Sequence, residues 1–114
     1  MHPSKALVLV IAVLAWTVLL AAVPATGAGA DGKAIFLAQK CNLCHSIETA
    51  GIERTSKAEK TKGPDLAGAA KRHDAEWIKK FLTKQEQLNG KKHLKEVKSS
   101  PEELDALVAW VSKQ

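Results

Sequence analysis

The stretch Cys41-Asn42-Leu43-Cys44-His45 holds both cysteines of this 114-residue chain, placed three positions apart and followed directly by a histidine. A disulfide between the two cysteines would close a very small loop. The stabilisation that a disulfide gives becomes smaller as the loop that it closes becomes shorter. The pair therefore needs a chemical explanation other than a structural disulfide.

Cys-x-x-Cys-His is the pattern by which a c-type haem is attached to a polypeptide. Each thiolate adds to one vinyl group of the haem to form a thioether, and the histidine that follows is brought under the iron as its proximal ligand. The sequence therefore predicts one covalently attached haem c. Cys41 and Cys44 are its expected thioether residues, and His45 is the expected proximal iron ligand.

Two other uses of a cysteine pair fit the sequence less well. A thioredoxin-like redox site needs a surrounding βαβ pattern, which this sequence lacks. A zinc site could use Cys41, Cys44 and His45, but here the histidine follows the second cysteine directly. The sequence also shows no second pair of ligands at a spacing typical of tetrahedral zinc sites. Haem attachment is the favoured interpretation.

The first 30 residues are typical of a secretory signal peptide. The basic segment Met1–Lys5 precedes the uncharged apolar run Ala6–Val23, and Ala28-Gly29-Ala30 fits a cleavage site that leaves a domain of residues 31–114. The alternative is an uncleaved membrane anchor, because an apolar run of this length is near the lower limit for crossing the hydrocarbon core. Both interpretations predict a domain that is periplasmic or otherwise exported from a bacterial cell.

The 84 residues after the signal segment can form one small domain. A chain of this size buries only about 60–65% of its unfolded surface and is often completed by a metal, a disulfide or a cofactor. A large apolar cofactor such as haem would supply the missing core.

Positive charge is concentrated in one third of this domain. The full chain has a net charge of +5. The lysine cluster is either a solvated face that aids solubility or a docking surface that attracts acidic redox proteins. Nucleic-acid binding is disfavoured, because aromatic residues do not interleave with the lysines and no known motif is present. The cluster consists of Lys79, Lys80, Lys84, Lys91, Lys92, Lys95 and Lys98.

The apolar pattern predicts an all-α fold without strands. Residues 31–46 are typical of a helix whose apolar residues, Ile35 to Leu37, precede the cysteines. Residues 46–62 are polar and charged without apolar periodicity, which indicates a surface loop. Gly63-Pro64-Asp65 then predicts a turn.

Two further helices are expected. Asp74 is suited to cap the first of them, and Asn89-Gly90 to end it. Ser100, Pro101 and Glu103 predict the start of the last helix, as a Ser-x-x-Glu capping box with proline at the first helical position. The apolar faces consist of Trp77, Ile78, Phe81 and Leu82 in one helix and of Leu104, Leu107, Val108, Trp110 and Val111 in the other.

From residue 31 onwards the chain resembles the small class I c-type cytochromes, which are monohaem proteins. The resemblance implies a small cytochrome c fold of three or more helices wrapped round one haem, with the first and last helices crossing. It also implies that the Pro64 carbonyl accepts the second N–H of the proximal histidine and so orients that ring. The matching residues are Gly32, Phe36, Cys41 to His45, Gly63-Pro64-Asp65-Leu66, Leu107 and Trp110.

The second axial ligand departs from the pattern of that family, whose members generally use a methionine. The only methionine here is Met1, in the predicted signal peptide. His93 stands in Asn89-Gly-Lys-Lys-His93, where relatives carry methionine, and is the favoured distal ligand; His73, a lysine or an empty site are the alternatives. His73 is expected to begin or cap a helix at the surface. A histidine in place of methionine should lower the redox potential.

These features favour a one-electron carrier and not an enzyme, because two axial ligands leave no open coordination position. The expected partners are redox donor and acceptor proteins with acidic docking surfaces. One alternative is a five-coordinate haem protein that binds gases or acts like a peroxidase. Another is a cytochrome subunit of an oxidoreductase complex, anchored to the membrane by an uncleaved N-terminus.

Overall fold

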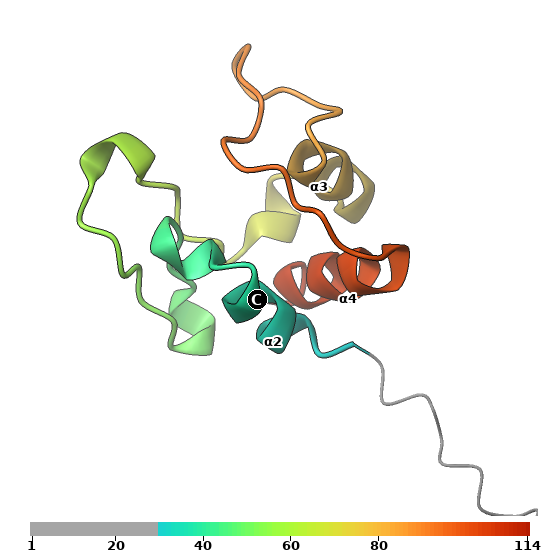
Figure 1. Cartoon of the computed structure of the whole chain (residues 1–114), viewed down its shortest axis with the longest axis horizontal. Helices are drawn as coiled ribbons and strands as arrows, with labels where there is room; N and C mark the ends of the chain where they lie inside the picture. Colours follow the sequence, from blue (N-terminus) through green and yellow to red (C-terminus); the bar gives the residue numbers. More distant parts are fainter. Residues whose placement is uncertain (1–29) are drawn as a thin grey trace, which may run out of the picture.

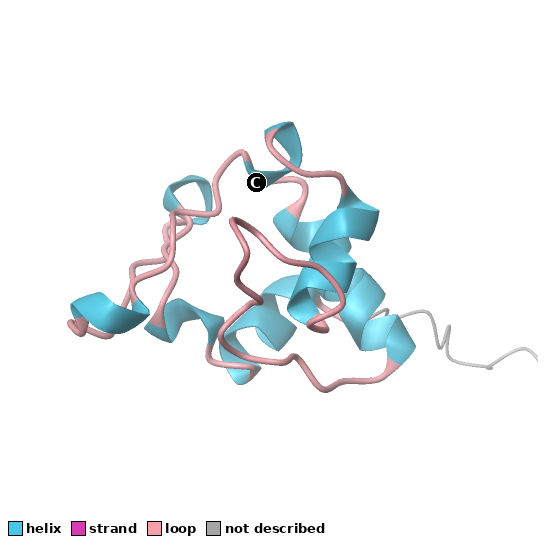
Figure 2. Ribbon diagram, turned by 90° about the horizontal axis from the view of Figure 1, so that it is seen from above, coloured by secondary structure: helices cyan, strands magenta, loops and turns pink. Residues whose placement is uncertain are grey.

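The computed structural model describes residues 30–114, so residues 1–29, which make up nearly all of the predicted signal peptide, lie outside the described residues. Three α-helices form in this part of the chain: α2 (Gly32–Ala38), α3 (Ala75–Leu82) and α4 (Pro101–Val111) (Figure 1). Residues 30–114 contain isolated β-bridges but no strand (Figure 2), which confirms the predicted all-α fold. Among the described helices, none is long and apolar enough to cross a membrane.

Helices α2 and α4 cross at close range, as the resemblance implies. A Cβ atom added to Gly32 would lie 2.2 Å from Cβ of Trp110 and 2.5 Å from the backbone oxygen of Ala106. Phe36 packs against Trp110 with ring centres 5.5 Å apart, and Leu107 is 1% exposed. The absence of a side chain at Gly32 therefore lets the two helices approach.

Helices α3 and α4 begin as their sequences predict. The Asp74 side chain accepts a hydrogen bond of 2.7 Å from the backbone N–H of Trp77. Ser100 and Glu103 form the full capping box, with Pro101 in the first turn. Lys79 and Asp105 join the two helices through an exposed ion pair of 2.7 Å.

The first helix is shorter than predicted. It ends at Ala38, and Lys40 adopts a left-handed backbone conformation with φ of 57°. Cys41–Leu43 then form a separate 3-10 turn in which the N–H of His45 donates to the carbonyl of Cys41. The helix ends where its apolar residues end, so the cysteines lie on a turn and not on the helix.

Residues 46–62 are not only a surface loop. Short 3-10 turns form at Glu48–Ala50 and Glu59–Thr61. Ile47 is fully buried in the core, and it exchanges two backbone hydrogen bonds with Ile52. The segment lacks a repeating apolar pattern because its contribution to the core is mainly this one side chain.

The residues between α3 and α4, here called the 83–99 loop, extend over the helices (orange in Figure 1). Helix α3 ends at Leu82, earlier than predicted, and the Thr83 hydroxyl donates to the carbonyl of Lys79. Asn89 and Gly90, both with positive φ, instead form a tight turn inside the loop. Val97 then returns the chain to the core, since it is buried and its N–H donates to the carbonyl of Leu82.

Candidate functional site

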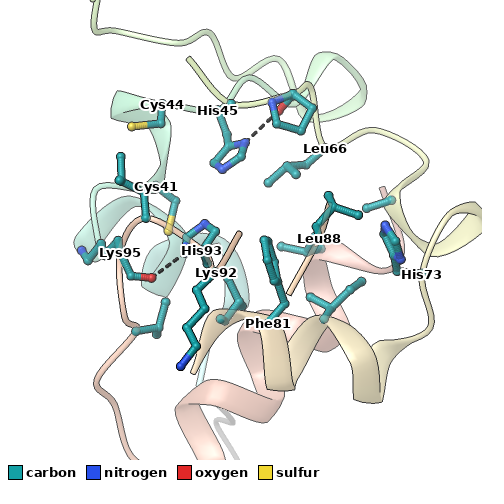
Figure 3. A pocket seen from close by; sticks show the side chains of 18 of the residues that line it. Cys41, Cys44, His45, Leu66, His73, Phe81, Leu88, Lys92, His93 and Lys95 are labelled. Atoms are coloured by element: carbon teal, nitrogen blue, oxygen red, sulfur yellow. Dashed lines mark hydrogen bonds between the residues drawn. The ribbon is translucent and has the colours of Figure 1, made fainter. Parts of the chain in front are cut away.

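A cavity of about 800 Å³ opens among the three helices, the cysteine segment and the 83–99 loop (Figure 3). Its walls are mainly apolar, so the cavity suits a large apolar molecule. The apolar residues that line it are Phe36, Leu66, Ala69, Trp77, Ile78, Phe81, Leu82, Leu88, Leu94, Val97, Leu107 and Val111, with Pro64 near His45.

Cys41 and Cys44 lie together at one edge of this cavity and are not bonded to each other. Their segment is held by residues of the following loop: the N–H of Thr55 donates to the carbonyl of Asn42, and the N–H of Ser56 to that of Leu43. Burial raises the pKa of the Cys41 thiol, so its surroundings favour an uncharged sulfur. A thioether sulfur is uncharged, and the surroundings of Cys41 therefore fit covalent attachment of haem.

His45 projects into the cavity from the residue after Cys44. Its Nδ1 lies 2.8 Å from the carbonyl oxygen of Pro64. Because a carbonyl can only accept, Nδ1 must carry the proton and Nε2 keeps its lone pair for a metal. Burial lowers the pKa of His45, and the hydrogen bond to Pro64 opposes this effect. The ring is thus oriented and kept neutral, as a metal-binding imidazole must be.

Gly63 forms a cradle for the His45 ring, a role that its sequence context alone did not indicate. A Cβ atom at this position would lie 2.3 Å from Cε1, 2.5 Å from Nδ1 and 2.8 Å from Nε2 of His45. The N–H of Gly63 also donates to the carbonyl of Cys44 over 2.8 Å. Any side chain at residue 63 would displace the imidazole.

His93 faces His45 across the cavity (Figure 3). The two ring centres are 6.1 Å apart and the ring planes are 8° from parallel. Nδ1 of His93 donates to the backbone carbonyl of Lys95, which in the neutral ring leaves the lone pair on Nε2. The edge of Phe81 packs on the His93 ring with centres 5.2 Å apart.

This spacing fits an iron between the two rings. Two metal–imidazole bonds of about 2 Å, each extended by about 1 Å from nitrogen to ring centre, place the rings about 6 Å apart. The observed 6.1 Å between His45 and His93 agrees with that separation. The residues present therefore fit a haem: Cys41 and Cys44 would hold its edge, and the two imidazoles would hold its iron.

His73 does not face His45. Its ring stacks on Trp77 with centres 3.8 Å apart, and Trp77 in turn stacks on Phe81 at 4.8 Å. In Figure 3 it lies across the cavity from the two cysteines. Asp74, and not His73, caps helix α3, and His73 is half-buried and not at the open surface. The sequence-based placement of His73 as a surface cap is therefore wrong.

Among residues 30–114, the lysine and arginine side chains that line the cavity are not accompanied by any aspartate or glutamate. Of the predicted lysine cluster, only Lys91, Lys92 and Lys95 line the cavity, and Lys79 instead pairs with Asp105 on α4. Four of the cations lie outside that cluster in the sequence and meet it only through the fold. The lining cations, here called the basic rim, are Lys40, Lys60, Lys62, Arg72, Lys91, Lys92 and Lys95.

Comparison with a family model identifies the family of this chain. A family model described as Cytochrome c matches residues 29–114, which is most of the chain. The searches of curated proteins and of solved structures return no match. A cytochrome c domain implies a covalently attached haem c, and the small size of this one fits a single haem. The chain therefore belongs to the cytochrome c family, whose members are in general electron carriers.

Proposed function

We propose that the protein is an exported, monohaem one-electron carrier whose iron is bound by His45 on one side and His93 on the other. When bound, the haem supplies an iron that alternates between its ferrous and ferric states. The observation that carries the proposal is the facing pair of imidazoles, 6.1 Å apart and nearly parallel. Cys41 and Cys44 would hold the haem through thioethers.

The surroundings of the two histidines suit electron transfer better than catalysis. The carbonyls of Pro64 and Lys95 fix both rings from behind, so the ligands need not move when the charge on iron changes. An iron with two axial protein ligands leaves no position for peroxide or for a gas such as oxygen. The geometry thus supports a carrier over a five-coordinate gas-binding or peroxidase-like protein.

Two effects act on the redox potential in opposite directions. An imidazole in place of a thioether favours ferric iron and lowers the potential. The basic rim favours the less positive ferrous state and raises it. Axial ligation is the larger effect, because it contributes to a range of about 0.8 V across haem proteins, whereas exposed charges are screened by salt. The proposed carrier therefore has a lower potential than its His/Met-ligated relatives.

The basic rim also supports docking of acidic redox proteins. Complementary charge increases the rate at which such partners associate. Two exposed apolar side chains accompany the cations: Leu94, which is 72% exposed, and Leu43, which is 45% exposed and lies between the cysteines. A transient partner would contact these leucines while its carboxylates approach the lysines.

We infer that residues 1–30 direct export and are removed, which would place the domain of residues 31–114 in the bacterial periplasm or beyond. The A-x-A pattern at Ala28-Gly29-Ala30 supports this inference. Determining the N-terminus of the mature protein tests it. A chain that begins at Asp31 supports a freely diffusing carrier, and one that retains the apolar run supports an anchored subunit.

Potentiometric titration of three proteins tests the proposed ligation. Replacing His93 with methionine should raise the potential on the order of 0.1 V, because a thioether stabilises ferrous iron. The matched change His73→Met alters the cavity histidine that is not a proposed iron ligand and should leave the potential nearly unchanged. A His93→Met protein with the potential and spectrum of the wild type would contradict the assignment.

A further inference from the structure

Few interactions hold the part of the 83–99 loop that carries His93. Before it, Leu88 and Lys91 exchange two backbone hydrogen bonds across the tight turn. After it, Val97 is anchored to Leu82. Between these two points, the described chain makes no backbone–backbone hydrogen bond. Something other than secondary structure must therefore keep His93 in place.

Two side-chain hydrogen bonds join this loop to Gln39, the residue that follows helix α2. The ammonium group of Lys95 donates to the backbone carbonyl of Gln39. The side-chain amide of Gln39 donates in return to the carbonyl of Lys98, over 3.2 Å. Gln39 is the C-cap residue of α2 and lies two residues before Cys41. The bonds thus connect the His93 loop to the haem-attachment segment.

Lys95 has a second connection, to His93 itself. Its backbone carbonyl accepts the hydrogen bond from Nδ1 of the His93 ring. One residue therefore joins the orientation of the imidazole to the end of helix α2. A displacement of Lys95 away from Gln39 would withdraw the carbonyl that orients the ring.

We propose that Gln39 and Lys95 form a latch that keeps His93 on the iron, so that both are positioning residues for the distal ligand. This inference rests on the proposed ligation by His93. Without the latch, the loop opens more often and His93 dissociates faster. Each hydrogen bond is at the surface and contributes modestly, so loss of one should accelerate dissociation about three- to tenfold.

Carbon monoxide binding to the reduced protein measures this dissociation. Carbon monoxide can bind only after His93 leaves, so at high gas concentration the observed rate reaches the rate of His93 dissociation. The test compares wild type with Lys95→Met and Gln39→Ala. The control Lys98→Met removes the same charge from the same loop, at an ammonium group whose side chain is 84% exposed, and keeps both latch hydrogen bonds.

We expect the limiting rate to be three- to tenfold above that of wild type in Lys95→Met and Gln39→Ala, and within about twofold of wild type in Lys98→Met. Lys95→Arg keeps a cationic donor and should restore a rate near that of wild type. Urea unfolding of each variant separates loop opening from global destabilisation, because the rates should rise without a matching fall in stability.

Two results would contradict the latch. One of them leaves ligation by His93 intact, and the other contradicts that ligation as well. If the wild type is six-coordinate and Lys95→Met behaves like Lys98→Met, the latch is wrong while ligation by His93 stands. If the reduced wild type is five-coordinate and binds carbon monoxide without a limiting rate, the proposed ligation is wrong and the latch is wrong with it.

Discussion

The imidazole rings of His45 and His93 have their centres 6.1 Å apart and their planes 8° from parallel. Each ring is held from behind by a backbone carbonyl, that of Pro64 for His45 and that of Lys95 for His93. Backbone carbonyls of two separate segments therefore orient the two rings.

This orientation predicts the magnetic properties of the oxidised protein. Parallel imidazole planes act on the same d orbital of low-spin ferric iron and separate it in energy from its neighbour. The electron paramagnetic resonance spectrum of the frozen ferric protein should therefore be rhombic, with three resolved g-values. A single strongly shifted feature, typical of perpendicular rings, would show that the rings do not keep the orientation seen here.

Gly63→Ala should disturb His45 without straining the backbone. The added methyl group would come within 2.3 Å of the His45 ring, which must then turn away from Pro64. We expect a fraction of high-spin haem in the absorption spectrum and a stability loss of about 1–3 kcal/mol.

Gly90→Ala is the matched control for this change. Gly90 has a positive φ of 75° and no atom within 4 Å of an added Cβ, so alanine there strains only the backbone. Its stability should decrease by about 1 kcal/mol while its spectrum stays that of the wild type. Equal spectra for the two variants would show that Gly63 has no role in placing His45.

Gly32→Ala should destabilise the crossing of α2 and α4. Helix propensity alone favours alanine by up to about 1 kcal/mol. The contact of 2.2 Å with Trp110 outweighs that gain, and we expect a net loss of about 1–3 kcal/mol in urea unfolding. Lys33→Ala, at an exposed neighbouring position, should change stability by less than about 0.5 kcal/mol. A Gly32→Ala protein as stable as the wild type would mean that the helices are less closely packed than described.

The Asp65 carboxylate should make the stability of the folded protein depend on pH in the acid range. Its carboxylate accepts hydrogen bonds from the Ser46 hydroxyl at 2.6 Å and from the backbone N–H of Ala67 at 2.8 Å, and the bond from Ser46 is the main reason that its pKa lies below the ordinary value of 3.8. The resulting stabilisation is present above pH 3.8 and is lost as the pH falls through the lower folded-state pKa.

Asp65→Asn removes this dependence, because an amide does not titrate. Urea unfolding of both proteins at several pH values should show a modest deficit for Asp65→Asn at neutral pH that shrinks below about pH 4. A deficit that stays constant with pH would mean that Asp65 acts through packing and not through its charge.

Local rules were sufficient for the second and third helices. Asp74 and the Ser100–Glu103 capping box mark the start of α3 and α4 in the sequence, and the structure confirms both. Gly32 and Trp110 meet at the crossing that the resemblance to class I cytochromes implies. These features depend on a few neighbouring residues or on a motif with a known spacing, so one sequence can reveal them.

Features that depend on long-range contacts could not be predicted in this way. The left-handed Lys40 that ends α2 early and the burial of Ile47 have no periodic signal. Gly63 was expected only as part of a turn, because its contact with His45 exists only in the folded chain. The hydrogen bonds between Gln39 and the 83–99 loop join residues 56 and 59 positions apart, and no local pattern specifies them.

The central claim, that His93 is the distal ligand, is tested most directly by absorption spectra of wild type, His93→Ala and His73→Ala in both redox states. The wild type and His73→Ala should be low-spin and six-coordinate whether oxidised or reduced. His93→Ala should become high-spin in the reduced state and bind carbon monoxide without a limiting dissociation step. A His93→Ala protein that stays low-spin with the wild-type spectrum would contradict the claim.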